Sequence, residues 1–61
     1  MAPYENRLGM LEARCSVFAA ELLRQLHHHP RFSELMDILE AIDGPIYRGD
    51  VENALMQVNE K

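Results

Sequence analysis

The feature that most limits the fold of this chain is a row of apolar residues through its first half. The row comprises Leu8, Leu11, Cys15, Phe18, Leu22 and Leu26, at spacings of three and four positions. This spacing is typical of one face of an α-helix. It predicts one uninterrupted helix of about 25 residues, which begins near Tyr4 or Glu5 and ends near His28. Such a stripe has to be covered, either by the rest of the chain or by a partner.

A second helical pattern follows Pro30, which suits the first position of a helix because its missing N–H needs no partner there. The apolar face of this helix comprises Phe32, Leu35, Met36, Leu39 and Ile42. The Asp43-Gly44-Pro45 segment predicts its end, since a glycine past the last turn followed by proline stops a helix.

A third helix is expected after a linker formed by residues 46–49, with Asp50 as its N-cap. Its inner face comprises Val51, Ala54, Leu55 and Val58. We therefore predict an all-α fold in a single domain, residues 1–61: a helical hairpin of the long first helix and the shorter second helix, with a short third helix over one end.

The first helix would span roughly 36 Å and the second roughly 20 Å, at 1.5 Å per residue. Part of the stripe is then left bare, and a chain of 61 residues buries little surface by itself. We therefore expect the stripe residues to bind a partner, which is a second copy of the chain in a homodimer or another protein. The expected partner-binding residues are Leu8, Leu11, Cys15, Phe18, Leu22 and Leu26.

The charge of the chain is uneven. Residues 1–31 hold four arginines and three glutamates, while residues 32–61 hold two basic and seven acidic side chains, so the halves carry +1 and −5 within a net charge of −4. An acidic surface repels phosphates and attracts basic partners, so nucleic acid is not expected as a ligand. No apolar run approaches the roughly 20 residues that span a bilayer, and no secretory signal precedes the first helix, so we expect a cytoplasmic protein without a membrane segment.

Three features bear on chemistry, and we expect each to be structural. His27, His28 and His29 are consecutive and so point about 100° apart, which does not suit a metal site within one chain. A role for them in a pH-dependent assembly stays open. Cys15 lies at the spacing of core residues in the first helix. Paired carboxylates lie on the faces of the second and third helices opposite their apolar residues: Glu34 with Asp37, Glu40 with Asp43, and Asp50 with Glu52. We therefore expect no catalytic activity, no metal or other cofactor and no small-molecule substrate.

Residues 46–55, Ile-Tyr-Arg-Gly-Asp-Val-Glu-Asn-Ala-Leu, resemble the junction between the two helices of a tetratricopeptide repeat. Similar stretches occur in the small, repeat-like chaperones of bacterial type III secretion, which are cytoplasmic and cover an amphipathic helix of their client. The resemblance implies that Gly49 permits a tight turn and that Ala54 permits close helix packing. The Asp43-Gly44-Pro45 stop departs from the continuous helix that such a repeat has before this glycine.

Together these patterns indicate a non-catalytic helical module for protein interaction: an adaptor, a chaperone or a regulatory subunit. The alternative is a small dimeric DNA-binding regulator. In that alternative Arg7, Arg14 and Arg24, which lie on nearly one face of the first helix, would contact the duplex.

Overall fold

The computed structural model describes the backbone of residues 3–60 and the side chains of residues 6–60. Four α-helices and one short 3₁₀-helix follow one another: α1 (Pro3–Arg14), α2 (Val17–Gln25), η1 (Leu26–His28), α3 (Phe32–Glu40) and α4 (Arg48–Asn59). Within these residues no strand forms, and the nearest approach to one is an isolated bridge between Cys15 and Ile46. The prediction of an all-α fold is confirmed.

The prediction of one long first helix is wrong, because the chain leaves helical geometry at Cys15 and Ser16. Ser16 is extended, with φ −64° and ψ 167°, and its side chain caps α2 by accepting the N–H of Ala19. The amide of Ser16 donates to the carbonyl of Ile46 at 2.9 Å, and the amide of Ile46 donates to the carbonyl of Arg14 at 2.9 Å. The break is therefore stabilised because backbone groups that lose their helical partners find new ones in a distant segment.

The loop between α3 and α4 is held against the end of α1 by Arg14. Its guanidinium donates to the carbonyl of Ile42 and to that of Gly44, the latter at 2.8 Å. Gly44 has φ +97°, a conformation that other residues rarely adopt. The predicted stop after the second helix is thus confirmed, and the glycine is used to turn the chain toward Ile46.

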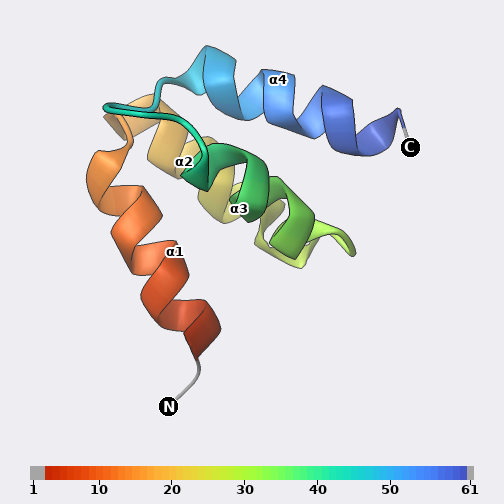
Figure 1. The fold of residues 1–61 in the computed structure, drawn as a ribbon, viewed down its shortest axis with the longest axis horizontal. Coiled ribbons are helices and arrows are strands. Elements are labelled where there is room, and N and C mark those ends of the chain that lie inside the picture. Colours follow the sequence, from red (N-terminus) through yellow and green to blue (C-terminus); the bar gives the residue numbers. More distant parts are fainter. Residues whose placement is uncertain (1–2, 61) are drawn as a thin grey trace.

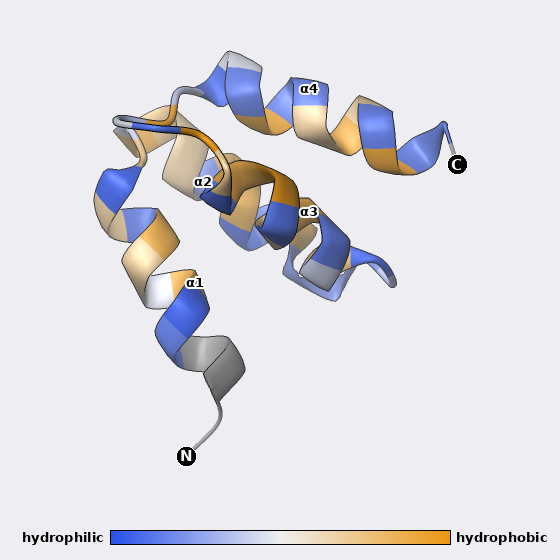
Figure 2. Ribbon diagram, viewed as in Figure 1, coloured by the Kyte–Doolittle hydropathy of each residue, from blue (hydrophilic) through white to orange (hydrophobic). Residues whose placement is uncertain are grey.

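The helices α2 and α3 run in opposite directions, and α4 packs against both, while α1 leaves this group at a steep angle and contacts α3 (Figure 1). Most apolar residues of α4 face the other helices, and its polar residues face away (Figure 2). One hydrophobic core lies between the helices. Its buried residues are Leu11, Ala19, Leu23, Phe32, Leu35, Met36, Leu39, Ile46, Val51, Ala54 and Val58.

The inner faces predicted for the second and third helices are confirmed. Phe32, Leu35, Met36 and Leu39 are buried on α3, with Ile42 half-buried just beyond it; Val51, Ala54 and Val58 are buried on α4, with Leu55 half-buried. The start of α4 differs from the prediction, because its N-cap is Tyr47. Asp50 lies three residues later, and its carboxylate accepts the N–H of Tyr47 at 2.9 Å.

The break also turns α2 about its own axis relative to the predicted stripe. Leu23 and Ala19 face the core, although neither belongs to the stripe, and Phe18 is 65% exposed. Because a helix has 3.6 residues per turn, one extended residue is enough to move the inward face to other positions. Within the chain Phe18 is therefore not covered, although it belongs to the predicted stripe.

Two truncations on adjacent turns of α2 test which face of this helix points into the core. Leu23→Ala is expected to lower the free energy of unfolding by about 2–5 kcal/mol, because it leaves a cavity in the core. Phe18→Ala is expected to lower it by about 1 kcal/mol or less, because most of that side chain already contacts water. Urea denaturation of the two variants gives both values, and a larger loss for Phe18→Ala than for Leu23→Ala would contradict the fold.

Candidate interaction surface

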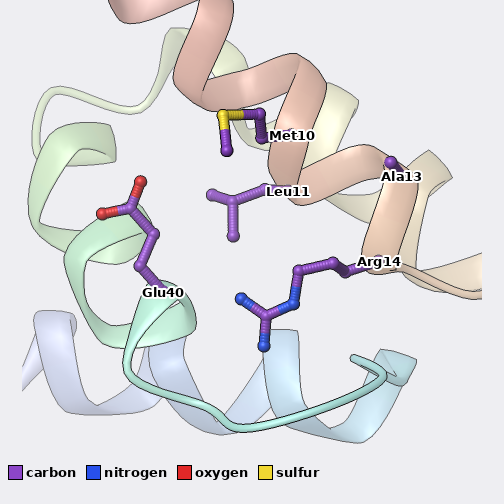
Figure 3. Close-up of a pocket in the computed structure, with 5 residues that line it drawn as sticks. All are labelled: Met10, Leu11, Ala13, Arg14 and Glu40. Carbon is purple, nitrogen blue, oxygen red and sulfur yellow. The ribbon is translucent and has the colours of Figure 1, made fainter.

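An open, largely apolar pocket lies between α1 and α3. Its volume is about 530 Å³, and it is lined by Met10, Leu11, Ala13, Arg14 and Glu40. In Figure 3, Leu11 extends into the space between the helices below Met10, with Glu40 across from them and Arg14 along one side. Met10 is 72% exposed, whereas Leu11 is buried and forms the floor. The pocket therefore offers an apolar floor and a flexible apolar edge to an approaching group.

Helical spacing explains why α1 supplies this lining. Met10, Ala13 and Arg14 are separated by three and four positions, so their side chains share one face of the helix. The face lies beside the predicted stripe rather than on it. A search for flanking apolar positions in α1 would have found Met10 and Ala13, but Glu40 joins them only because α3 folds back along α1.

The charged groups at the edge of the pocket are satisfied within the chain. The guanidinium of Arg7 donates to both carboxylate oxygens of Glu40, at 2.9 and 2.8 Å, and to Asp37 at 2.6 Å. These hydrogen bonds favour the ionised form of Glu40 and hold its pKa below the ordinary value of 4.5. Arg14 is held by loop carbonyls. Both charged groups of the lining are thus held by partners within the chain.

The structure divides the predicted partner-binding residues between two places. Leu8 and Leu11 lie on α1, and Phe18, Leu22 and Leu26 lie on α2, with Cys15 at the break between the helices. Phe18 and Leu22 line a second, shallow pocket with Glu21, Gln25 and Arg48. Leu11 is buried, Phe18 is exposed, and Leu8, Cys15, Leu22 and Leu26 are partly buried against the core. The six side chains therefore do not form one continuous surface.

The long overhang that predicted an uncovered stripe is also absent, because α1 ends at Arg14 and its Leu8 and Leu11 pack on the core. The accessible surface of the chain is 4106 Å². A folded monomer of 7.0 kDa is expected to expose about 4,000 Å². The chain thus covers itself as well as a typical monomer does, and the homodimer stays a prediction that the length of the first helix no longer supports.

The reactive residues have structural partners. Burial is the main cause of the raised pKa of the Cys15 thiol, with a smaller contribution from Glu12, so the thiol stays protonated. The ring of His27 meets that of Phe32 edge-on at 5.6 Å, and Nδ1 of His29 accepts the N–H of Arg31 at 3.0 Å. Among the described side chains, residues 6–60, no three His, Cys, Asp or Glu come together as a metal site would require.

All five arginines make contacts inside the chain. Besides Arg7 and Arg14, Arg31 binds Glu34 at 2.7 Å and the carbonyl of Val58 at 2.6 Å. Arg48 binds Glu52 at 3.2 Å, and Arg24 lies 3.9 Å from Glu12. The guanidinium groups that the alternative function would use on DNA thus serve to connect the helices.

None of the described helices is both long and apolar enough to pass through a bilayer. No protein-family model matches the chain, and neither a curated protein nor a solved structure shows significant similarity to it. The function is therefore argued from the surface itself.

The Arg7–Glu40 contact predicts a pH dependence of stability. The folded state lowers the pKa of Glu40, so this contribution is fully present above the carboxyl pKa of the unfolded chain and is lost as the pH falls through the lower value of the folded chain. Glu40→Gln is expected to flatten the loss of stability below about pH 4.5. Urea midpoints measured from pH 3 to pH 7 check this, with Glu60→Gln as a control at an exposed carboxylate. Equal acid sensitivity in the wild type and in Glu40→Gln would contradict the prediction.

Proposed function

We propose that this protein is a non-catalytic helical module that binds an amphipathic helix of another protein along the α1–α3 face. The observation that carries the proposal is the open apolar pocket, with Met10 exposed at its edge and Leu11 at its floor. A groove between two helices is the form in which proteins commonly receive an apolar helix face. In this role the protein is an adaptor, a chaperone or a regulatory subunit.

The volume of the pocket does not decide between a side chain and a small molecule, because small-molecule sites span about 300–1,000 Å³. The polar groups of the lining decide between an apolar side chain and a polar small molecule as the ligand. A site for a polar substrate needs a few donors or acceptors that converge on it, whereas Glu40 and Arg14 are directed to partners in the chain. An apolar side chain needs no such group, and it gains about 25 cal/mol for each Å² of apolar surface that it removes from water.

Charge favours a basic partner. The chain carries −4, and its second half, which includes α3, carries most of the acidic residues. Two carboxylates, Asp37 and Glu40, share the single guanidinium of Arg7 near the pocket. A helix with lysines or arginines beside its apolar face would meet this excess at close range.

The resemblance of residues 46–55 to a tetratricopeptide-repeat junction supports protein binding by analogy with the small secretion chaperones that contain such stretches. In the structure Gly49 lies in the first turn of α4, and Ala54 is buried where α4 packs against its neighbours. Gly49 is helical and has no positive φ, so it makes no tight turn here, and only the buried Ala54 is consistent with a role that the resemblance implies. A shared partner class is part of the proposal only.

The test uses two designed peptides of about 18 residues, long enough for five helical turns. Both have a leucine face, and they differ in carrying lysines or glutamates on the polar face. Titration of ¹⁵N-labelled protein with the lysine peptide is expected to shift the amides of residues 10–14 and 37–41. The glutamate peptide is expected to bind at least about tenfold more weakly, since like charges oppose its approach.

A matched pair of variants locates the site. Met10→Lys places a positive charge at the edge of the pocket, and Met56→Lys places the same charge at a methionine on α4 that is 59% exposed. Met10→Lys is expected to weaken binding of the lysine peptide at least about tenfold, which corresponds to about 1.4 kcal/mol, and Met56→Lys is expected to change it little. Shifts confined to α2 and α4, or equal effects of the two variants, would refute the proposed site.

A mobility shift with nonspecific duplex DNA at low salt tests the alternative. Retention of the duplex, lost in Arg24→Ala, would favour the DNA-binding regulator over the proposed function.

A further inference from the structure

The junction between α1 and α2 has the properties of a hinge. Neither Cys15 nor Ser16 is a proline or a glycine, and both have negative φ, so each residue is able to enter a helix. At Ser16 the main departure from helical geometry is in ψ, which is 167°. The apolar spacing of the sequence also continues across this point, from Leu11 through Cys15 to Phe18. The sequence thus supports one continuous helix here, while the structure uses two.

The broken form leaves part of the junction uncovered. Val17 is 73% exposed and Phe18 is 65% exposed, immediately after the break. Tyr47, next to the bridged Ile46, is 59% exposed. Three of the most exposed large apolar side chains therefore lie within three residues of the bridge.

The contacts between α1 and α3 do not depend on the link to α2. Arg7 reaches Asp37 and Glu40 across the gap between the helices, and Leu11 is buried against the core. A second copy of the chain carries an α3 with the same carboxylates and the same apolar groove. That surface is complementary to α1 in charge and in shape, whichever chain supplies the helix.

We propose that two copies of this chain exchange α1. In the exchanged dimer Cys15 and Ser16 become helical, α1 and α2 form one straight helix, and each α1 packs on α3 of the other copy. In the straight helix the Ser16 amide, which leaves the Ile46 carbonyl, donates to the carbonyl four residues earlier, and the Arg14 carbonyl, which leaves the Ile46 amide, accepts the amide four residues later. Phe18 and Val17 lie where the two straight helices meet. The surface of α3 on which α1 packs is then occupied by α1 of a second copy, so this inference goes beyond the proposed function and does not depend on it.

Hinge variants test the exchange, because each favours one backbone geometry. Val17→Pro suits the broken form: Val17 is the first residue of α2, where proline needs no partner, and Ser16 already has the extended conformation that proline favours in the residue before it. In the straight helix the same proline is internal. It is expected to weaken dimerisation by about a hundredfold or more.

Ser16→Ala has the opposite effect, because it removes the cap of α2 and adds a strong helix former. It is expected to strengthen dimerisation about fivefold. Val17→Ala is the matched comparison: it removes the same side chain from the dimer contact but is compatible with both backbone geometries, so it is expected to weaken dimerisation by about tenfold or less, well short of the loss caused by Val17→Pro. Sedimentation equilibrium over a range of concentrations gives the constants. If Ser16→Ala remains a monomer at every concentration, or if Val17→Pro dimerises as well as the wild type, the exchange is refuted.

A charge-reversal pair shows whether α1 is the exchanged element. Arg7→Glu and Glu40→Arg each place like charges together when α1 packs on its own α3. In an exchanged heterodimer of the two variants, Glu at position 7 meets Arg at position 40, and the wild-type pair re-forms at the other groove. Native mass spectrometry of the mixture, with one variant ¹⁵N-labelled, is expected to show heterodimer in large excess over either homodimer. A statistical mixture of dimers would show that they associate without exchanging α1.

Discussion

The backbone pairing between the α1–α2 junction and Ile46 is the contact on which the broken geometry of the single chain depends. Two hydrogen bonds of 2.9 Å join Ser16 and Arg14 to Ile46, in a segment thirty residues later in the chain. They satisfy the amide and carbonyl that the broken helix releases, and they place the fully buried side chain of Ile46 in the core. Without them an extended Ser16 would leave polar groups unpaired beside the core, where each would cost roughly 1–3 kcal/mol.

The sequence predicts α3 and α4 well because their determinants are local. The spacing from Phe32 to Leu39 and the glycine-proline stop lie within a few turns of one another, and the structure buries the residues so identified. The prediction of the first helix is wrong because its break depends on a contact with a distant part of the chain. Its spacing is regular and Ser16 is only a weak stop signal, so the break is decided by Ile46, which sequence patterns place in a linker. Because the break is missed, the prediction places Phe18 on the inner face and misses Leu23, whereas the structure exposes Phe18 and buries Leu23.

The candidate surface is predictable only in part for the same reason. Leu11 belongs to the predicted stripe, and Met10 and Ala13 flank it on α1, so a local search would have found the α1 side of the pocket. Glu40 and its partner Arg7 are thirty-three residues apart, and nothing in either local sequence indicates that they meet. Their contact follows from the direction in which α1 leaves the broken junction.

In this small domain the arginine contacts orient the elements, and the apolar core supplies most of the stability. The arginines connect elements: Arg7 joins α1 to α3, Arg14 joins α1 to the loop, and Arg31 joins the start of α3 to the end of α4. These exposed contacts are individually weak, and the core supplies most of the stability. Their main effect is on specificity, since each fixes the direction of an element that apolar packing alone would leave free to slide. With the basic groups so occupied, the remaining surface charge is acidic.

The break in the first helix is a compromise that depends on what is available to cover the stripe. A straight helix of that length has no intramolecular cover for both of its halves, because α3 and α4 are short. An isolated chain therefore gains more by folding α1 onto α3, where Leu11 is buried, than by keeping the helix continuous. Full burial of one such side chain contributes about 1.5–3 kcal/mol, which is comparable to the contribution of the few backbone bonds that differ between the two forms. The geometry of the junction is thus set by the surfaces within reach of the chain, and the same residues are consistent with a different geometry when a second surface is offered.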